Sequence, residues 1–310
     1  MKNTHLEHPE DTILTGDLSV LNWFTAQGEL SAKIDGAPAI VWGRNPATGN
    51  FFVGTKSVFN KKKIKINETH QDIDANHGGI VGSILHKCLD HLPRIHGIIQ
   101  GDFVGFGGDN MFCPNTISYV FPEIVTQEII IAPHTAYIAN EDLRDAFAYP
   151  IGRQLESTDE VLFVQPQVEL SKHLDDIADY CRFAKQMAMM VEFTDDRTAT
   201  KIKKHINACI KDAKGIDENE IAEKFNVDIN LIRLWKLVES IKLDMLAFIT
   251  CDDSITCLIQ HEITDHEGYV MTNDYGMYKI VNLDMFSFYN FTLAKNWSWV
   301  MLTEAHKVSP

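Results

Sequence analysis

The residues best suited to chemistry lie in SAKIDGAPAIVWG, residues 31–43, where Lys33 precedes an Asp–Gly pair and an apolar run. A lysine at the end of a strand, facing a β-lined cleft, becomes a nucleophile when its ammonium loses a proton. Burial or a neighbouring cation favours that loss. The targets of such an amine are phosphorus and carbonyl centres. Lys33 is therefore the candidate nucleophile, and Asp35 is the candidate to orient it or to bind a metal ion.

Other charged residues supply the groups that phosphoryl transfer also requires, which are cations for the phosphate oxygens and carboxylates for a divalent metal. Lys56 follows Gly54 and Thr55 near the end of the run NFFVGTKSV. Far downstream, Glu267 opens the segment EGYV and Lys279 lies in YKIV. We expect strand pairing to bring these side chains to the same cleft as Lys33.

The elements that must position these residues are short strands rich in β-branched and aromatic residues, separated by Gly, Pro and Asn. The predicted strands before residue 140 are 29–34, 37–43, 50–58, 97–105 and 126–138. The segment RNPATG between the second and third runs suits a hairpin turn. A helix is predicted over 79–92, GIVGSILHKCLDHL.

From about residue 171 to 249, apolar residues recur at three- and four-residue spacing, which is typical of amphipathic helices. Strand-like runs then resume at 254–263, 268–272, 276–282 and 286–293. The pattern predicts an α+β fold with antiparallel sheets. Its strands come from residues 1–139 and 251–310, and residues 140–250 form a mainly helical insert.

The ordered set of motifs resembles the covalent nucleotidyltransferase superfamily, which comprises the ATP-dependent polynucleotide ligases and the mRNA capping enzymes. KIDG at 33–36 resembles motif I, IIQGDFVG at 98–105 resembles motif III, EGYV at 267–270 is similar to motif IV, and YKIV at 278–281 is similar to motif V. The resemblance implies an ATP-grasp-like ligase domain. Only about thirty residues follow motif V, too few for an oligonucleotide-binding barrel, and among the relatives this favours phage-type RNA ligases.

By this resemblance, Lys33 takes up AMP from ATP as a lysyl-AMP intermediate, and AMP then passes to a polynucleotide 5′-phosphate before a phosphodiester bond forms. The resemblance assigns Glu267 and Asp35 to a Mg²⁺ or Mn²⁺ ion and Lys279 to the α-phosphate. Lys56 and Asp102 join the nucleotide site. RNA or another polynucleotide end is the implied partner, and the helical insert is expected to contact this substrate or a protein. An aromatic ring should stack on the base, and Tyr137 and Phe103 are candidates, although core packing explains either one.

Three departures from the family pattern leave alternatives open. Ala37 occupies a position that is often serine, Asp102 replaces a glutamate, and Met277 replaces the first lysine of motif V. One alternative is a nucleotidyltransferase with another acceptor, such as a guanylyltransferase or a protein-modifying enzyme. The other is a catalytically drifted protein that keeps the nucleotide-binding scaffold.

Composition narrows the remaining classes. The net charge of −15 argues against a broadly basic nucleic-acid surface, so a polyanion would need a local patch such as KSVFNKKKIK or KIKKH. No apolar run reaches the roughly 18 to 20 residues of a membrane span, and the polar N-terminus does not resemble a signal peptide. We expect a cytoplasmic protein with reduced cysteines. HKCLDHLPRIH lacks a second Cys/His pair at ligand spacing, so no zinc site is predicted from it.

Overall fold

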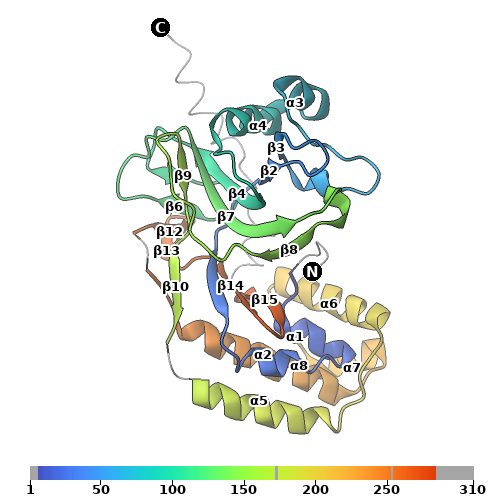
Figure 1. Cartoon of the computed structure of the whole chain (residues 1–310). Helices are drawn as coiled ribbons and strands as arrows, with labels where there is room; N and C mark the ends of the chain where they lie inside the picture. The colour runs from blue at the N-terminus through green and yellow to red at the C-terminus, as the bar shows by residue number, and fades with distance from the viewer. Residues whose placement is uncertain (1–5, 172–173, 253, 284–310) are drawn as a thin grey trace.

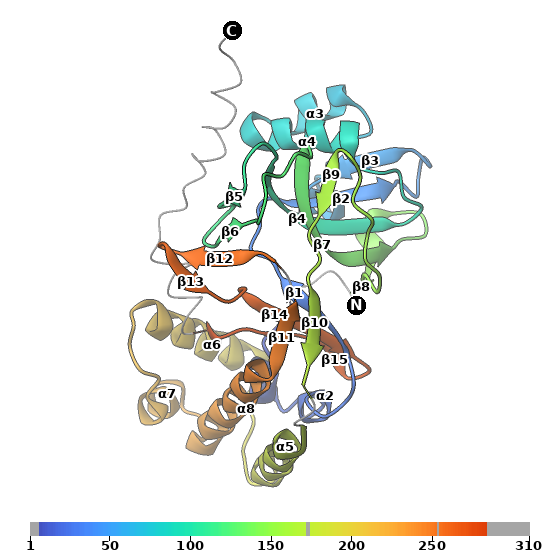
Figure 2. The ribbon, with the colours of Figure 1, turned by 90° about the vertical axis from the view of Figure 1, so that its left-hand side faces the viewer.

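The computed structural model describes residues 6–171, 174–252 and 254–283, and it confirms a mixed α+β fold with antiparallel sheets. Its layers follow one another along the long axis of the molecule (Figures 1 and 2). Two helices, α3 and α4, lie at one end. A six-stranded sheet, a three-stranded sheet and a helical layer follow in that order. The candidate residues of the sequence lie where the two sheets face each other.

The six-stranded sheet has the order β3-β2-β4-β7-β8, and β9 also pairs with β7. All its pairs are antiparallel except the parallel pair of β7 and β9. The predicted hairpin of the second and third runs is confirmed as β2 and β3. The bounds are β2 Ala39–Arg44, β3 Phe51–Gly54, β4 Ile98–Phe106, β7 Ile129–Ile138, β8 Phe147–Pro150 and β9 Val161–Phe163.

Helices α3 (His70–Asn76) and α4 (Gly79–His91) cover the outer face of this sheet. Apolar side chains of α4, including Leu85 and Cys88, share a buried core with Trp42 of β2 and Ile131 of β7. The helix predicted over 79–92 is therefore confirmed. Because α4 occupies one face of the sheet, the opposite face is left to line the space between the two sheets.

The three-stranded sheet pairs β1 (Glu29–Lys33) with β14 (Gly268–Asn273) and β14 with β15 (Gly276–Ile280), all antiparallel. Successive side chains of a strand point to opposite faces. One face carries residues of the helical core: Leu30, Ala32, Tyr269, Met271, Tyr278 and Ile280. The other face carries residues that line a pocket: Glu29, Ser31, Lys33, Val270, Thr272, Met277 and Lys279. The alternation thus joins the helical layer to the pocket through one thin sheet, and Leu30 and Ala32 also reach the pocket lining.

The helical layer contains α5 (Leu174–Ala188), α6 (Asp196–Lys211), α7 (Glu218–Phe225) and α8 (Ile229–Ala247). Its helices begin at Leu174 rather than at residue 140, because residues 147–170 contain strands. The N-terminal helices α1 (Pro9–Thr12), η1 (Ile13–Thr15) and α2 (Val20–Trp23) pack into the same core, although the sequence placed them with the sheets. Within the described residues, no helix has both the length and the apolar character that crossing a bilayer requires.

The remaining strands form two small sheets. The run 254–263 is not one strand. It contains β12, a turn and the first residues of β13, because Gln260 and His261 adopt positive φ angles of 51° and 73° between the two strands. The run 286–293 lies outside the described residues. The bounds are β5 Met111–Phe112, β6 Ser118–Val120, β12 Thr256–Ile259 and β13 Glu262–Thr264 in one sheet, with β10 Gln167–Leu170 and β11 Ile249–Asp252 in the other.

Candidate active site

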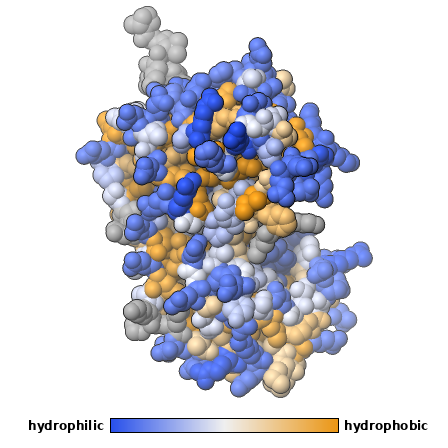
Figure 3. Space-filling view, viewed as in Figure 1, coloured by the Kyte–Doolittle hydropathy of each residue, from blue (hydrophilic) through white to orange (hydrophobic). Residues whose placement is uncertain are grey.

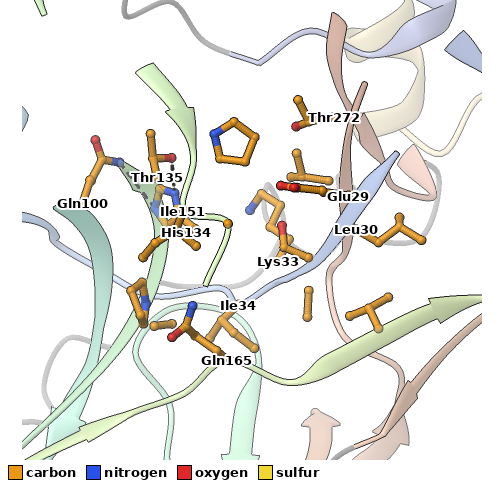
Figure 4. Close-up of a pocket in the computed structure, with 18 of the residues that line it drawn as sticks. Glu29, Leu30, Lys33, Ile34, Gln100, His134, Thr135, Ile151, Gln165 and Thr272 are labelled. Carbon is orange, nitrogen blue, oxygen red and sulfur yellow. Dashed lines mark hydrogen bonds between the residues drawn. The ribbon is translucent and has the colours of Figure 1, made fainter. Parts of the chain in front are cut away.

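A pocket of about 720 Å³ lies between the three-stranded sheet and the inner face of the six-stranded sheet. Lys33 projects into it from β1, across from Gln100, His134 and Thr135 on the opposite wall (Figure 4). On the face shown in Figure 3, hydrophilic side chains cover much of the surface, and hydrophobic patches lie among them in both halves. The residues that line the pocket come from both sheets, so distant parts of the chain enclose one cavity around the candidate nucleophile.

Lys33 contacts Glu267 directly, with its Nζ donating to Glu267 Oε2. Lys33 pairs with Gly268, the first residue of β14, so residue 267 lies immediately before this strand and beside the end of β1. Gly268 makes this close packing possible: its φ is +148°, and a Cβ there would lie 2.4 Å from the carbonyl oxygen of Ile280. Two residues separated by 234 positions in the chain thus form one ion pair.

Burial and charge act against each other in this pair. Burial lowers the pKa of Lys33, but Glu267, with smaller contributions from Asp35 and Asp102, outweighs it and raises the pKa overall. Burial also raises the pKa of Glu267, an effect that Lys33 opposes and the charge of Asp35 reinforces. These contacts favour the ammonium form of Lys33, which must lose a proton before the amine can act as a nucleophile. The Glu267 carboxylate in contact with it has a raised pKa and therefore binds a proton more readily than an exposed glutamate does.

Lys279 and Lys56 add two further cations to the pocket lining. Lys279 lies on β15 opposite Val270, on the same sheet face as Lys33. Burial lowers its pKa, and the positive charges of Lys33 and Lys56 lower it further. Lys56 begins the 3₁₀ helix η2 (Lys56–Phe59), rather than continuing a strand as the sequence predicts. Lysines from three elements converge here, an arrangement that favours a bound anion.

Asp35 occupies a different position from that expected for a metal ligand. It is buried outside the pocket lining, where its Oδ1 accepts a hydrogen bond from Asn115 Nδ2 at 2.8 Å and its Oδ2 accepts one from the Thr116 backbone N–H at 2.9 Å. The Asp35 backbone N–H donates to the hydroxyl of Tyr119 at 2.5 Å. These contacts anchor the chain just after β1, and the Asp35 carboxylate does not line the cavity.

Asp102 lines the pocket from β4, close to the KIDG turn. Gly36 allows this approach, because a Cβ at that position would lie 2.8 Å from both Asp102 Cβ and the carbonyl oxygen of Phe103. The Ala37 backbone N–H donates to Phe103 O at 2.9 Å. The turn after Lys33 is thereby held against the opposite sheet, and Asp102 faces the same space as the three lysines.

His134 is a pocket residue that the sequence analysis missed. Its Nε2 lies 3.7 Å from Asp102 Oδ2 and 3.4 Å from Gln100 Nε2, and its Nδ1 lies 2.7 Å from Thr135 Oγ1. Gln100 pairs with Thr135 and Gly101 pairs with Pro133, so His134 is the extra residue of a bulge in β7. Bulges redirect side chains beside functional sites. The available signal was Pro133 inside an otherwise regular strand pattern.

The two aromatic candidates for base stacking lie in different places. Tyr137 lines the pocket, where its hydroxyl donates to Gln100 Oε1 at 2.8 Å and its ring packs on Phe59. Phe103 is buried in the core beneath α4 instead. Met277 also lines the pocket, at the position where the family pattern has a lysine. Across the described part of the chain, no group of three or more His, Cys, Asp or Glu side chains is arranged to hold a metal ion.

Replacing Glu267 by glutamine is expected to make Lys33 more reactive toward amine reagents at pH 8. The variant loses the charge that raises the pKa of Lys33 and keeps the burial that lowers it, so a larger fraction of the amine is neutral at the pH of the experiment. We expect a several-fold faster trinitrophenylation of Lys33, followed by peptide mass spectrometry. Lys65, whose Nζ donates to Asn76 O outside the pocket, is the internal control. Equal rates in both proteins would contradict the ion-pair account.

Comparison with known proteins places the site within a defined family. One protein-family model matches residues 3–228 and 217–295 of the chain. The chain belongs to DUF6267, a family of unknown function. No curated protein and no solved structure matches it. The first matched segment of this DUF6267 chain carries Lys33, Lys56 and Asp102, and the second carries Glu267 and Lys279.

Proposed function

We propose that this DUF6267 chain is a covalent nucleotidyltransferase of the ATP-dependent RNA ligase type. The observation that carries the proposal is the meeting of Lys33 with Glu267, on a sheet face that it shares with Lys279. These are the residues that the family resemblance assigns to the nucleophile, the acidic group and the phosphate-binding cation. Asp102 enters the same pocket from β4 of the opposite sheet, and Lys56 lines it from η2.

The first chemical step joins Lys33 to the nucleotide. The Nζ of Lys33 forms a bond to the α-phosphorus of ATP, the bond between that phosphorus and the bridging oxygen breaks, and pyrophosphate leaves with the electron pair. The ammonium must first lose a proton, and the Glu267 carboxylate in contact with it is placed to receive one. Burial of Glu267 raises its pKa, which makes it a better proton acceptor.

The cations of the pocket offset the charge of the triphosphate. Lys279 and Lys56 both line the pocket, and the resemblance assigns Lys279 to the α-phosphate. Carboxylate oxygens of Glu267 and Asp102 are hard donors that suit Mg²⁺ or Mn²⁺, usually together with phosphate oxygens. When bound, such an ion withdraws negative charge from the phosphates. Asp35 is not proposed as a ligand, because its carboxylate holds Asn115 and the backbone of Thr116.

The second half of the reaction passes AMP to a polynucleotide 5′-phosphate, after which a 3′-hydroxyl displaces AMP and the phosphodiester bond forms. Exposed Lys61, Lys62 and Lys63 lie in the loop that follows Lys56. Such a local basic patch can bind backbone phosphates on a chain whose net charge is −15. Because this basic patch follows the pocket residue Lys56 closely in the chain, it supports a nucleic acid rather than a small molecule as the acceptor of AMP.

The test is incubation of the full chain with α-labelled ATP and magnesium, followed by intact-mass measurement. The expected result is a mass increase of one AMP, with the adduct mapped to Lys33 and a nicked or single-stranded RNA ligated on addition. Labelling by GTP alone would assign guanylyl transfer, and labelled protein in a lysate would indicate protein modification. No adduct with either nucleotide would overturn the proposal and identify a catalytically drifted scaffold, consistent with Met277 at a lysine position.

A further inference from the structure

Two histidines meet on the surface of the α3–α4 pair, on the side of the six-stranded sheet opposite the pocket. His70 begins α3 and His86 lies in α4. Their Nδ1 atoms are 2.7 Å apart, their ring centres are 5.0 Å apart, and their planes differ by 20°. The distance between the ring centres nearly equals the distance between the two Nδ1 atoms plus the distance from each Nδ1 to the centre of its own ring. The two centres and the two Nδ1 atoms therefore lie almost on one line. The rings therefore meet edge to edge, with the two Nδ1 atoms pointing at each other.

A carboxylate lies at the far side of each ring. Asp74 Oδ1 is 3.1 Å from His86 Nε2, and Asp90 Oδ1 is 3.0 Å from His70 Nε2. A carboxylate oxygen at this distance favours a hydrogen on the nitrogen that faces it. A neutral imidazole carries one hydrogen, so its Nδ1 is then an acceptor. Two acceptors that face each other at 2.7 Å repel unless a cation lies between them.

We propose that His70 and His86 form a binding site for a divalent transition-metal ion such as Zn²⁺. A ligating histidine usually bonds through its second nitrogen to a carboxylate, as both rings do here. Two neutral imidazoles with Asp74 and Asp90 carry a charge of −2, which a divalent ion balances. Imidazole nitrogen is a preferred ligand of zinc, copper and nickel rather than of Mg²⁺. The site is separate from the pocket and does not depend on the proposed function.

Binding requires a small movement of two accessible side chains. Zinc–nitrogen bonds of about 2.0 Å at a tetrahedral angle place the nitrogens about 3.3 Å apart, so the rings must separate by about 0.6 Å. The His70 and His86 side chains are 52% and 32% exposed, so both can rotate enough to separate the rings by this distance. No third ligand group is arranged at the site among the described residues. Water fills the remaining positions, and the affinity is lower than that of a closed four-ligand site.

A bound ion ties α3 to α4 across the short turn at His77 and Gly78. The helix α3 has only seven residues, so a tie to the longer α4 restricts it strongly. The ion therefore stabilises the folded chain by an amount that grows with the logarithm of its concentration once that concentration exceeds the dissociation constant. The sequence could not reveal the pair, because HKCLDHLPRIH lacks a second ligand and His70 lies 16 residues before His86.

The experiment titrates Zn²⁺ into the full chain with magnesium present, by calorimetry and by melting temperature. One site is expected, with a melting temperature that rises with Zn²⁺. His70→Ala and His86→Ala should each lower the affinity at least tenfold and abolish the rise, and Asp74→Asn should lower the affinity about tenfold. His96→Ala, at an exposed histidine outside the pair, should change neither.

Two outcomes would overturn this site. One is the absence of stoichiometric Zn²⁺ binding by the native chain, which would assign the 2.7 Å contact to a proton shared between the rings. The other is Zn²⁺ binding that survives both histidine substitutions unchanged, which would place the ion at cysteines or histidines elsewhere. Circular dichroism of each variant verifies that the comparison is made between folded chains.

Discussion

Lys33→Arg is expected to give a folded chain that forms no covalent nucleotide adduct. Arginine keeps a positive charge against Glu267, so the ion pair that joins β1 to the start of β14 is preserved. The guanidinium does not deprotonate in proteins and therefore cannot act as the nucleophile. The measurement is the intact mass after incubation with ATP and magnesium, which should fall from a detectable AMP adduct to none.

The matched control is Lys65→Arg, at a lysine whose Nζ donates to the carbonyl of Asn76 outside the pocket. This variant should form the adduct at the native rate. Lys279→Ala is expected to fold and to form the adduct far more slowly, because it removes a phosphate-binding cation and leaves the nucleophile in place. An adduct on Lys33→Arg, carried by any other lysine, would contradict the assignment of the nucleophile.

The pairing of the site residues could be predicted because short motifs fix strand register. KIDG ends one strand, and EGYV and YKIV are spaced as a hairpin, which the antiparallel pair of β14 and β15 confirms. Once β1 pairs with β14, alternation alone places Lys33 and Lys279 on one face. The antiparallel α+β class followed from the same strand patterns, since hairpin turns between short runs favour antiparallel neighbours.

Other features depend on contacts that local patterns do not encode. His134 enters the pocket because of a bulge, and a one-residue irregularity is not visible in an alternating pattern. Asp35 has the right type for a metal ligand, yet Asn115 and Thr116 engage its carboxylate from a loop 80 and 81 residues away. His70 meets His86 only because α3 folds back on α4. In each case a tertiary contact decides the role of the side chain.

The helical layer illustrates the same limit for the fold. The sequence assigned residues 1–139 to the sheet region, but Ile13, Leu14 and Trp23 are fully buried in the core that the helical layer forms. The indole of Trp23 donates to Met271 O of β14 at 3.3 Å. The N-terminal segment thus packs between the helices and the face of the three-stranded sheet opposite Lys33. Substitutions that loosen this packing should therefore shift the strands that carry the site residues.

Lys242→Met is expected to lower the free energy of unfolding by about 3–5 kcal/mol, because it leaves a buried charge unpaired. Lys242 of α8 and Glu10 of α1 are both completely buried, and Lys242 Nζ donates to Glu10 Oε1 at 2.5 Å. Without the lysine, the Glu10 carboxylate stays in the core with no cation to offset its desolvation. Urea unfolding at pH 7.5 measures the loss, and Lys204→Met, at an exposed position of α6, should change stability by less than about 0.5 kcal/mol.

The pH dependence of this variant follows from Glu10. Burial already raises the pKa of Glu10, an effect that Lys242 opposes, so removing Lys242 raises it further. The folded variant then binds a proton more tightly than the unfolded chain. Stability therefore falls as the pH rises from the ordinary glutamate pKa toward the raised one. We expect Lys242→Met to be least destabilised near pH 5 and most destabilised near pH 8.

The double variant Glu10→Leu/Lys242→Met separates the cost of an unpaired charge from the loss of packing. Replacing both members of a buried ion pair by apolar side chains is often neutral or stabilising. Most of the lost stability should therefore return, and its dependence on pH between 5 and 8 should flatten. If the double variant is as unstable as Lys242→Met at every pH, the pair acts through shape rather than charge, and the electrostatic account of how α1 is held on α8 is wrong.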